Sequence, residues 1–221
     1  GSSSVPAMGE PLRVVSWNVN GIRARHAEFI DFIAREKPDV MCLQEIKATA
    51  DQVPGSLTDL ADYDSMWHGG AGGYSGVSLH VRKGRFSERP KFGSPSIDVE
   101  HRIVTAEVDG HLFTSIYIPN GGKDYAAKLE FLAKLAEWVR EITTSGKHFV
   151  LTGDMNVTRG AIDVHPSQRK PDTIGQRPDE RALYENVLAA GLVDVARQLH
   201  PEDDRLFTWW PYWKAARERN L

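Results

Sequence analysis

Three short apolar runs, rich in β-branched and other hydrophobic residues, constrain this 221-residue chain most. They cover residues 12–19, 39–45 and 147–153, and their length and lack of a helical period predict buried strands. Each run ends in side chains that carry oxygen. If these strand ends meet in space, they form a cluster of carboxylates and amides: Asn18 and Asn20 after the first strand, Glu45 after the second, and Asp154 and Asn156 after the third.

Such a cluster has a defined chemistry. Two carboxylates at close range repel each other unless a cation lies between them. Hard oxygen ligands without cysteine suit Mg²⁺ or Mn²⁺ better than zinc, and a divalent ion on a few carboxylates is typical of phosphate-ester chemistry. Asp154 and Asn156, two apart on an extended segment, face the same way. Taken singly, each residue also fits a plainer role: Asn18 as a turn former, Glu45 as a solvated surface charge.

The remaining pattern predicts a mixed α/β fold. Asp124 is suited to cap a helix whose apolar residues step by three and four as far as Ile142. The segment 158–178 has no periodicity and is expected to be a surface loop. Strands and helices alternate irregularly, which favours packed mixed sheets over a regular parallel array. Further strands are expected at 63–67, 76–81, 101–108 and 111–118, and further helices at 26–36 and 179–190.

Composition narrows the class of protein. Twenty-seven basic against 30 acidic residues give a formal net charge of −3, which excludes a wholly basic DNA-coating protein but permits a local basic patch.

Cys42 is the only cysteine, so the chain has no internal disulfide. A reducing compartment is therefore favoured, which is the nucleoid-containing cytoplasm if the source is bacterial. No apolar run approaches the roughly 18 residues of a membrane span. Residues 1–9 are interpreted as a cloning remnant or disordered lead-in, and residues 10–221 as one domain.

Five motifs occur in order along this domain. They are SWNVNGIR at 16–23, LQEIK at 43–47, GYSGV at 73–77, YIPN at 117–120 and GDMNV at 153–157. Together they resemble the exonuclease III family of apurinic/apyrimidinic endonucleases, within the endonuclease/exonuclease/phosphatase superfamily. The resemblance implies a deoxyribonuclease-I-like four-layer α/β sandwich, with two packed mixed β-sheets flanked by helices.

The resemblance also implies an activity and a set of site residues. Members cleave duplex DNA on the 5′ side of abasic sites with Mg²⁺, Mn²⁺ being possible, and also trim or unblock 3′ ends. Glu45 is implied as the main metal ligand, with Asn18, Asp154 and Asn156 around it. Asp154 is implied to orient or deprotonate the attacking water, or to protonate the leaving oxygen. Tyr117 and Asn156 are implied to hydrogen-bond the scissile phosphate, and Asn120 to support them.

DNA contacts follow from the same resemblance. Tyr74 is expected to touch the DNA backbone, and the tryptophan-rich end to line the abasic pocket or wedge into the helix, although a tryptophan core is the plainer alternative. Lys123 stands where the family often has Arg, which weakens the expectation of a bidentate phosphate contact there. The full set of expected DNA-binding residues is Tyr74, Arg102, Asn120, Lys123, Lys128, Trp209, Trp213 and Arg217.

One departure from the family is substantial. Family members continue beyond the position of Leu221 with a segment that supplies an aspartate and the catalytic histidine, and none of the eight histidines here has that sequence context. The chain is therefore expected to be C-terminally incomplete and, as it stands, to lack part of the family's catalytic machinery. The expected partner is duplex DNA with abasic or 3′-blocked sites, bound by a monomer. The alternatives are a non-catalytic DNA-binding fragment and a superfamily phosphatase or phosphodiesterase acting on another phosphoester.

Overall fold

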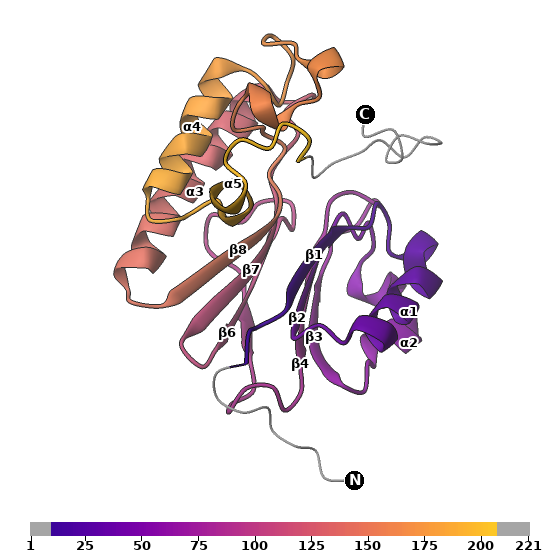
Figure 1. The fold of residues 1–221 in the computed structure, drawn as a ribbon. Helices are drawn as coiled ribbons and strands as arrows, with labels where there is room; N and C mark the ends of the chain where they lie inside the picture. The colour runs from indigo at the N-terminus through magenta and orange to yellow at the C-terminus, as the bar shows by residue number, and fades with distance from the viewer. Residues whose placement is uncertain (1–9, 207–221) are drawn as a thin grey trace. The chain divides into compact units, whose positions relative to one another are not determined.

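A computed structural model describes residues 10–206 of the chain (Figure 1). Contacts group these residues into two compact units, and each unit draws on two separate stretches of chain. The first comprises residues 10–117 with 146–154, and the second residues 118–145 with 155–206. No single linker separates such units, which agrees with the absence of a Gly-, Ser- or Pro-rich boundary in the sequence.

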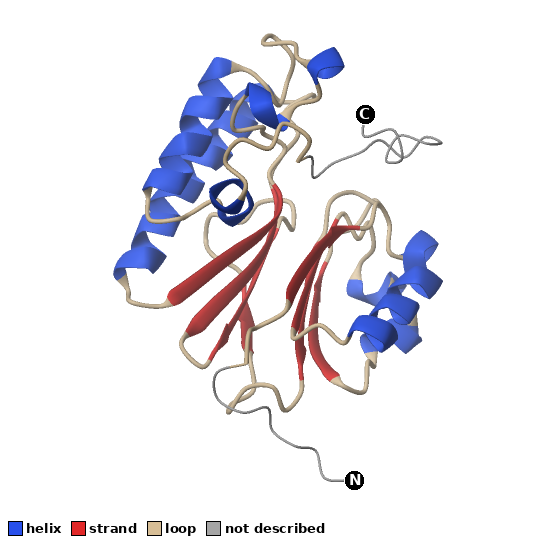
Figure 2. Cartoon of the chain, viewed as in Figure 1, coloured by secondary structure: helices blue, strands red, loops and turns tan. Residues whose placement is uncertain are grey.

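The first unit contains two four-stranded sheets, seen as red arrows in Figure 2. One sheet has the order β1-β2-β4-β3, with β1 parallel to β2 and the other neighbours antiparallel. The second has the order β5-β6-β7-β8, with only β7 and β8 parallel. The strands are β1 (Val14–Asn18), β2 (Val40–Gln44), β3 (Tyr63–His68), β4 (Val77–Arg82), β5 (Lys91–Gly93), β6 (Ile103–Val108), β7 (His111–Tyr117) and β8 (His148–Asp154).

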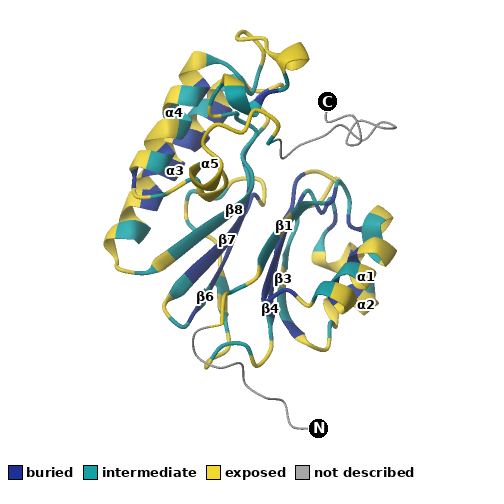
Figure 3. Ribbon diagram, viewed as in Figure 1, coloured by how far each residue is buried: buried dark blue, intermediate teal, exposed yellow. Residues whose placement is uncertain are grey.

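The two sheets of this unit pack face to face. Apolar side chains from the inner faces of both sheets form one buried cluster, which includes Cys42, Leu79, Val104 and Phe113. Strands β2 and β4 are almost wholly buried (Figure 3), as a strand covered on both faces must be. The expectation of two packed mixed sheets is confirmed.

Helices cover the outer face of the β1-β2-β4-β3 sheet. Helix α1 (His26–Glu36) is amphipathic and buries Phe29 and Ile33 against Met41 and Leu43 of β2, while α2 (Gly55–Thr58) adds the fully buried Leu57. Pro38 follows the left-handed C-cap at Lys37 and prevents α1 from continuing.

The second unit is built on two long helices, α3 (Tyr125–Thr144) and α4 (Pro178–Ala189). Asp124 caps α3 as predicted, because its side chain accepts a hydrogen bond from the Ala127 amide at 2.9 Å. Gly191, at a φ of +127°, ends the turn after α4 and lies against Thr143, where a Cβ atom would approach within 2.8 Å. The predicted surface loop 158–178 has only the short 3₁₀ turns η3 (Ala161–Asp163) and η4 (Pro166–Gln168).

The structure adds elements that the sequence pattern does not indicate. Strand β5 has three residues, and helices α2 and α5 (Val195–Leu199) have four and five, too short to show a period. Strand β6 begins at Ile103 instead of His101, because Glu100 and His101 both adopt left-handed backbone angles. None of the helices within residues 10–206 combines the length and apolar character of a membrane span.

A buried histidine in β4 makes the stability of the first unit pH-dependent. His80 is fully buried, and its two ring nitrogens lie 2.8 Å from Ser78 Oγ and 2.7 Å from Ser65 Oγ. Burial lowers the pKa of His80 from 6.5 to about 3. Its neutral ring therefore contributes stability that is complete above pH 6.5 and is lost as the pH falls toward 3.

We predict that His80→Gln flattens this acid dependence. Between pH 6.5 and 4.5 the parent protein should lose about 2–3 kcal/mol more unfolding free energy than the variant, measured by urea unfolding at each pH. His200→Gln, at an exposed position, should keep the parent's pH dependence. Parallel curves for the parent and His80→Gln would contradict the assignment.

Candidate active site

Three strand ends of the first unit meet at the side chain of Asn18. Its amide nitrogen donates to Glu45 Oε1 at 2.9 Å and to Asp154 Oδ2 at 3.0 Å, and its amide oxygen accepts from the Asn20 backbone N–H at 3.0 Å. Asn18 ends β1, Glu45 follows β2, and Asp154 ends β8 of the other sheet. The predicted gathering is therefore present within this unit for Asn18, Glu45 and Asp154, whereas Asn156 belongs to the second unit.

Backbone hydrogen bonds hold the loops that carry these residues. The Gly21 amide donates to the Glu45 carbonyl at 2.7 Å, and the Ile46 amide donates to the Gly76 carbonyl at 3.1 Å. Glu45 itself has a φ of +52°, and Asn20, Lys47 and Ser75 are also left-handed. Such conformations are costly for residues other than glycine and cluster at functional sites. They indicate that the loops carrying these residues have a functional role in addition to packing.

Gln44 joins the two sheets directly beneath this cluster. It is 1% exposed, and its amide donates to Ser16 Oγ on β1 and to Ser115 Oγ on β7, both at 3.1 Å. Ser115 Oγ in turn donates to the Leu43 carbonyl at 2.9 Å. A satisfied buried network of this kind fixes one arrangement of the strands. Sequence reasoning did not assign Gln44 a role, because a polar residue at the end of an apolar strand looks like a loop residue.

Gly153 explains why Asp154 can reach the cluster. Its φ is +149°, and a Cβ atom there would lie 1.9 Å from the Ile116 carbonyl oxygen of β7. Only glycine lets β8 pass β7 at this separation. The backbone thus requires the glycine of the Gly-Asp-x-Asn motif. Asp154, the next residue, ends β8 beside Asn18.

Tyr117, the last residue of β7, also faces the cluster. Burial, followed by the Glu45 carboxylate to which its hydroxyl is hydrogen-bonded and by the nearby Asp154, raises the pKa of Tyr117 above its usual value. The Arg102 guanidinium acts in the opposite direction. At neutral pH the phenol therefore stays protonated and serves as a hydrogen-bond donor, as the sequence-based role requires.

Lys47, the last residue of the LQEIK motif, also belongs to this cluster, although no role was predicted for it from the sequence. Lys47 Nζ donates to Asn20 Oδ1 at 2.7 Å and lies 3.5 Å from Glu45 Oε2. Its side chain is about one-third exposed, so the ammonium places positive charge next to the two carboxylates at the surface. Its position two residues after Glu45 was the available signal.

The side chains of this cluster fit a hard divalent cation. Glu45 and Asp154 supply carboxylate oxygens beside the Asn18 amide nitrogen, while the amide oxygens of Asn18 and Asn20 accept from the Asn20 backbone N–H and from Lys47. Within residues 10–206 no group of three or more His, Cys, Asp or Glu side chains is placed to bind a metal ion. An ion held by so few carboxylates would keep several waters, as Mg²⁺ commonly does.

Arg102 requires a correction to the expected DNA contacts. The side chain is 1% exposed, and its guanidinium donates to Tyr74 Oη at 2.7 Å and to the Tyr117 carbonyl at 3.1 Å. A guanidinium buried among these partners does not reach a DNA phosphate. Tyr74, half exposed on its glycine-rich loop, keeps the surface position that a backbone contact needs.

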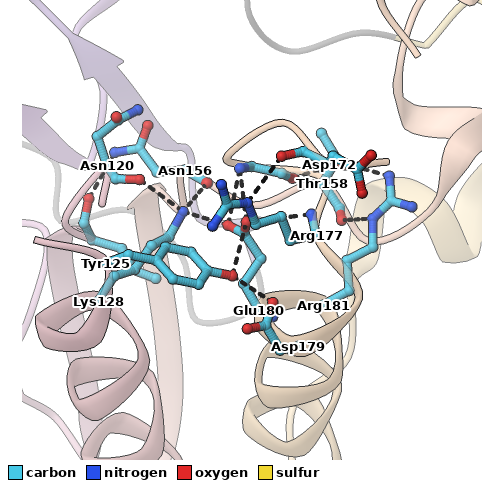
Figure 4. Close-up of polar contacts among 12 residues, drawn as sticks. Asn120, Tyr125, Lys128, Asn156, Thr158, Asp172, Arg177, Asp179, Glu180 and Arg181 are labelled. Atoms are coloured by element: carbon cyan, nitrogen blue, oxygen red, sulfur yellow. Dashed lines mark hydrogen bonds and ion pairs between the residues drawn. The ribbon is translucent and has the colours of Figure 1, made fainter. Parts of the chain in front are cut away.

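Lys128 requires the same correction, and it belongs to a separate polar cluster in the second unit (Figure 4). It is fully buried, and its ammonium donates to the Asn156 carbonyl at 2.7 Å and to the Asn120 carbonyl at 3.0 Å. It also forms an ion pair of 2.5 Å with Glu180, which is fully buried as well. Lys128 therefore holds the backbone of two predicted site residues instead of a phosphate.

Glu180 connects this cluster to the loop before α4. Its carboxylate accepts from the Gly175 amide at 2.9 Å and from the Arg177 amide at 3.3 Å, and it lies 3.4 Å from the Tyr125 hydroxyl, which donates to Asp179 (Figure 4). The Arg177 guanidinium stacks over the Tyr125 ring at 4.6 Å. Lys128 and Glu180 thus anchor a loop that has no periodic structure of its own.

The other predicted residues lie as follows. Asn156 has a φ of +50°, and its side-chain nitrogen donates to the Ile118 carbonyl at 2.7 Å, which orients the amide. Asn120 and Lys123 are exposed, as surface contacts require. The predictions for Trp209, Trp213 and Arg217 concern residues outside the described part of the chain.

Comparison with known proteins gives consistent matches. Residues 15–221 match the model of the endonuclease/exonuclease/phosphatase family. Curated relatives that cover 95% of this chain are recombination repair protein 1 of Drosophila melanogaster (31% identical), DNA repair nuclease APEX1 of Danio rerio (30%) and the exodeoxyribonuclease of Bacillus subtilis (30%). The chain spans 31%, 70% and 84% of their respective lengths.

Solved structures of similar fold agree with this family match. An AP endonuclease from Archaeoglobus fulgidus has a TM-score of 0.84 at 29% identity, covering 96% of this chain and 83% of that one. The 3′ phosphatase NExo from Neisseria, bound to a product DNA hairpin, has a TM-score of 0.81 at 29% identity with the same coverage. The chain therefore has the deoxyribonuclease-I-like fold that the motifs implied.

We predict that Asn18→Asp lowers stability in the absence of divalent cations. The change removes two donated hydrogen bonds and adds a third negative charge, so in EDTA the unfolding free energy at pH 7 should fall by about 2–4 kcal/mol. Added Mg²⁺ should restore more stability to the variant than to the parent in a thermal melt. Asn186→Asp, at an exposed position on α4, serves as the control. Equal melting of Asn18→Asp and the parent in EDTA would contradict the geometry.

We predict a large cost for removing the buried cation of the second unit. Lys128→Met leaves the Glu180 carboxylate buried without its partner, and should destabilise the protein by about 3–5 kcal/mol in urea unfolding. The double change with Glu180→Gln should recover part of this loss. Lys134→Met breaks an exposed pair with Glu130 on the same helix and should cost less than about 1 kcal/mol. A similar loss of unfolding free energy in Lys128→Met and Lys134→Met would contradict the assignment of a buried Lys128–Glu180 ion pair.

Proposed function

The chain belongs to the exonuclease III branch of the endonuclease/exonuclease/phosphatase family, whose named members are hydrolases, and we propose that it hydrolyses the phosphodiester bond on the 5′ side of abasic sites in duplex DNA with Mg²⁺. The observation that carries the proposal is the Asn18 amide, which joins the Glu45 and Asp154 carboxylates. Enzymes of the exonuclease III family depend on a divalent metal, and this cluster contains ligands for one.

Each residue of the cluster has a role in this reaction. Hydrolysis concentrates negative charge on the phosphoryl oxygens, which a divalent cation held by Glu45 and Asn18 would neutralise. Tyr117 stays protonated, and its hydroxyl hydrogen, donated to Glu45 in this structure, would be donated to a phosphoryl oxygen when Glu45 holds the cation. Asp154 orients the attacking water and accepts its proton, or protonates the leaving oxygen. For Asn156 and Asn120 of the second unit the family resemblance implies a donated hydrogen bond to the scissile phosphate and its support.

We include 3′-end processing in the proposal, as 3′–5′ exonuclease and 3′-phosphodiesterase activity. NExo from Neisseria, 29% identical to this chain, is described in one structure as a 3′ phosphatase and in another as a 3′–5′ exonuclease. A site that cleaves next to a missing base and one that cleaves at a 3′ end bind the same phosphodiester. DNA is the partner that the relatives support, and we propose that one copy of the protein acts alone.

We predict that Glu45→Gln and Asp154→Asn each lower cleavage of an abasic duplex by at least about 100-fold in the full-length protein. Both substitutions keep the size of the side chain and remove charge, so the affinity for uncleaved duplex in EDTA should change less than about threefold. Rates would be measured on a labelled abasic duplex with Mg²⁺ and, separately, with Mn²⁺.

Asp31→Asn, on the exposed face of α1, is the matched control and should cleave at the parent rate. Undiminished cleavage in either active-site variant would exclude the assignment. Duplex binding with no metal-dependent cleavage by the full-length parent would favour a DNA-binding protein instead, and hydrolysis confined to soluble phosphoesters would favour a phosphatase.

A further inference from the structure

Arg102 makes an unusual set of contacts for a buried arginine. Its guanidinium lies over the rings of both Tyr74 and Tyr117, at 5.4 and 5.0 Å from their centroids. It also donates to the Tyr74 hydroxyl and to the Tyr117 main-chain carbonyl. The phenol that the proposed reaction uses, Tyr117, and the expected DNA contact, Tyr74, are thus held by one cation that is itself inaccessible.

The hydrogen bonds around Arg102 show why a side chain is needed here. The Tyr117 amide donates to the Arg102 carbonyl at 2.9 Å, as in a regular antiparallel pair of β6 and β7. The return bond from the Arg102 amide is missing, because that amide donates to Asp98 Oδ1 at 2.8 Å. The guanidinium of Arg102 supplies the donor that the Tyr117 carbonyl would otherwise lack.

Asp98 secures the turn that presents Arg102. Its Oδ1 also accepts from the Ile103 amide at 2.9 Å, and its Oδ2 lies 2.6 Å from His68 Nε2. Glu100 and His101 between them are both left-handed, a strained arrangement that persists only when its surroundings enforce it. The contacts of Asp98 are those surroundings, so Arg102 is held from both its main chain and its side chain.

We propose that Arg102 is a positioning residue, which sets the Tyr117 phenol on Glu45 and fixes Tyr74 on the glycine-rich loop. The proposal rests on the proposed nuclease function, because it assigns Tyr117 a part in the reaction. A planar guanidinium can stack between two rings and donate in two directions at once, which a lysine ammonium cannot. Because Tyr74 accepts from Arg102, its own hydroxyl hydrogen points elsewhere and is available to a DNA phosphate.

The test compares Arg102→Met and Arg102→Lys with Tyr117→Phe in the full-length protein. Arg102→Met should lower kcat for abasic-duplex cleavage about 10- to 100-fold and change KM less than threefold. Arg102→Lys should recover less than a fifth of the parent kcat. The double variant Arg102→Met with Tyr117→Phe should match Tyr117→Phe alone within threefold, because the arginine acts through that tyrosine. Arg82→Met, which breaks a pair with Asp39 away from the cluster, should leave cleavage unchanged.

Two readouts separate positioning from a phosphate contact and from a loss of folding. The salt dependence of duplex binding should keep its slope in Arg102→Met, whereas a lost phosphate contact reduces the slope by about one. The ¹³Cζ signal of Tyr117 should move in Arg102→Met toward its position in Glu45→Gln, since both changes loosen the phenol from Glu45. Arg102→Lys, which keeps the charge and most of the volume, supplies the same measurements if Arg102→Met does not fold.

A reduced salt slope, multiplicative effects in the double variant, or an unmoved Tyr117 signal would each overturn the proposal. Failure of the nuclease function is distinguishable, because the parent would then not cleave the abasic duplex or Glu45→Gln and Tyr117→Phe would leave cleavage unchanged, whereas the Tyr117 signal and the salt slope still report on Arg102. If those two variants abolish cleavage while Arg102→Met behaves like Arg82→Met, the nuclease function stands and the positioning role falls.

Discussion

Asn18 holds the interaction on which the rest of the site depends. Its amide nitrogen donates to two carboxylates that come from different sheets, Glu45 and Asp154. Without a cation those carboxylates repel each other, and a neutral amide with two hydrogens offers each of them a partner without adding charge. The arrangement requires the ends of β1, β2 and β8 to stay in register. The buried Gln44 network between the sheets and the close passage at Gly153 provide that register.

Two buried cations organise the backbone next to the predicted chemistry. Arg102 completes the hydrogen bonds of Tyr117 in the first unit, and Lys128 holds the carbonyls of Asn120 and Asn156 in the second. Both residues were expected to contact DNA phosphates. A buried charge is costly unless it is paired and hydrogen-bonded, and each of these pays that cost by fixing main-chain atoms that carry proposed active-site side chains. A basic residue can therefore serve the proposed function indirectly, through the main chain that it fixes.

Much of the fold and part of the site could be predicted from local patterns. The apolar runs at 12–19, 39–45 and 147–153 are strands, and the stepped apolar residues after Asp124 form a capped helix, because burial periodicity and capping are local properties. The clustering of Glu45 and Asp154 followed from their places at strand ends, and their roles followed from the resemblance to the exonuclease III family. The role of Gln44 followed from neither, since its partners Ser16 and Ser115 lie on strands distant in sequence and no local signal reports such pairings. For Lys47 the only local signal was its place two residues after Glu45.

The sequence by itself determined the class of elements, the strand ends that carry oxygen, and the family to which the chain belongs. Only the tertiary structure decided which charges are surface groups and which are internal. Arg102 and Lys128 are indistinguishable in the sequence from solvated basic residues, because exposure is set by what packs around a side chain after the chain has folded. Hydrogen bonds between segments distant in the sequence, such as those from Lys128 to Asn156 and Glu180, created the environments that give both residues their roles.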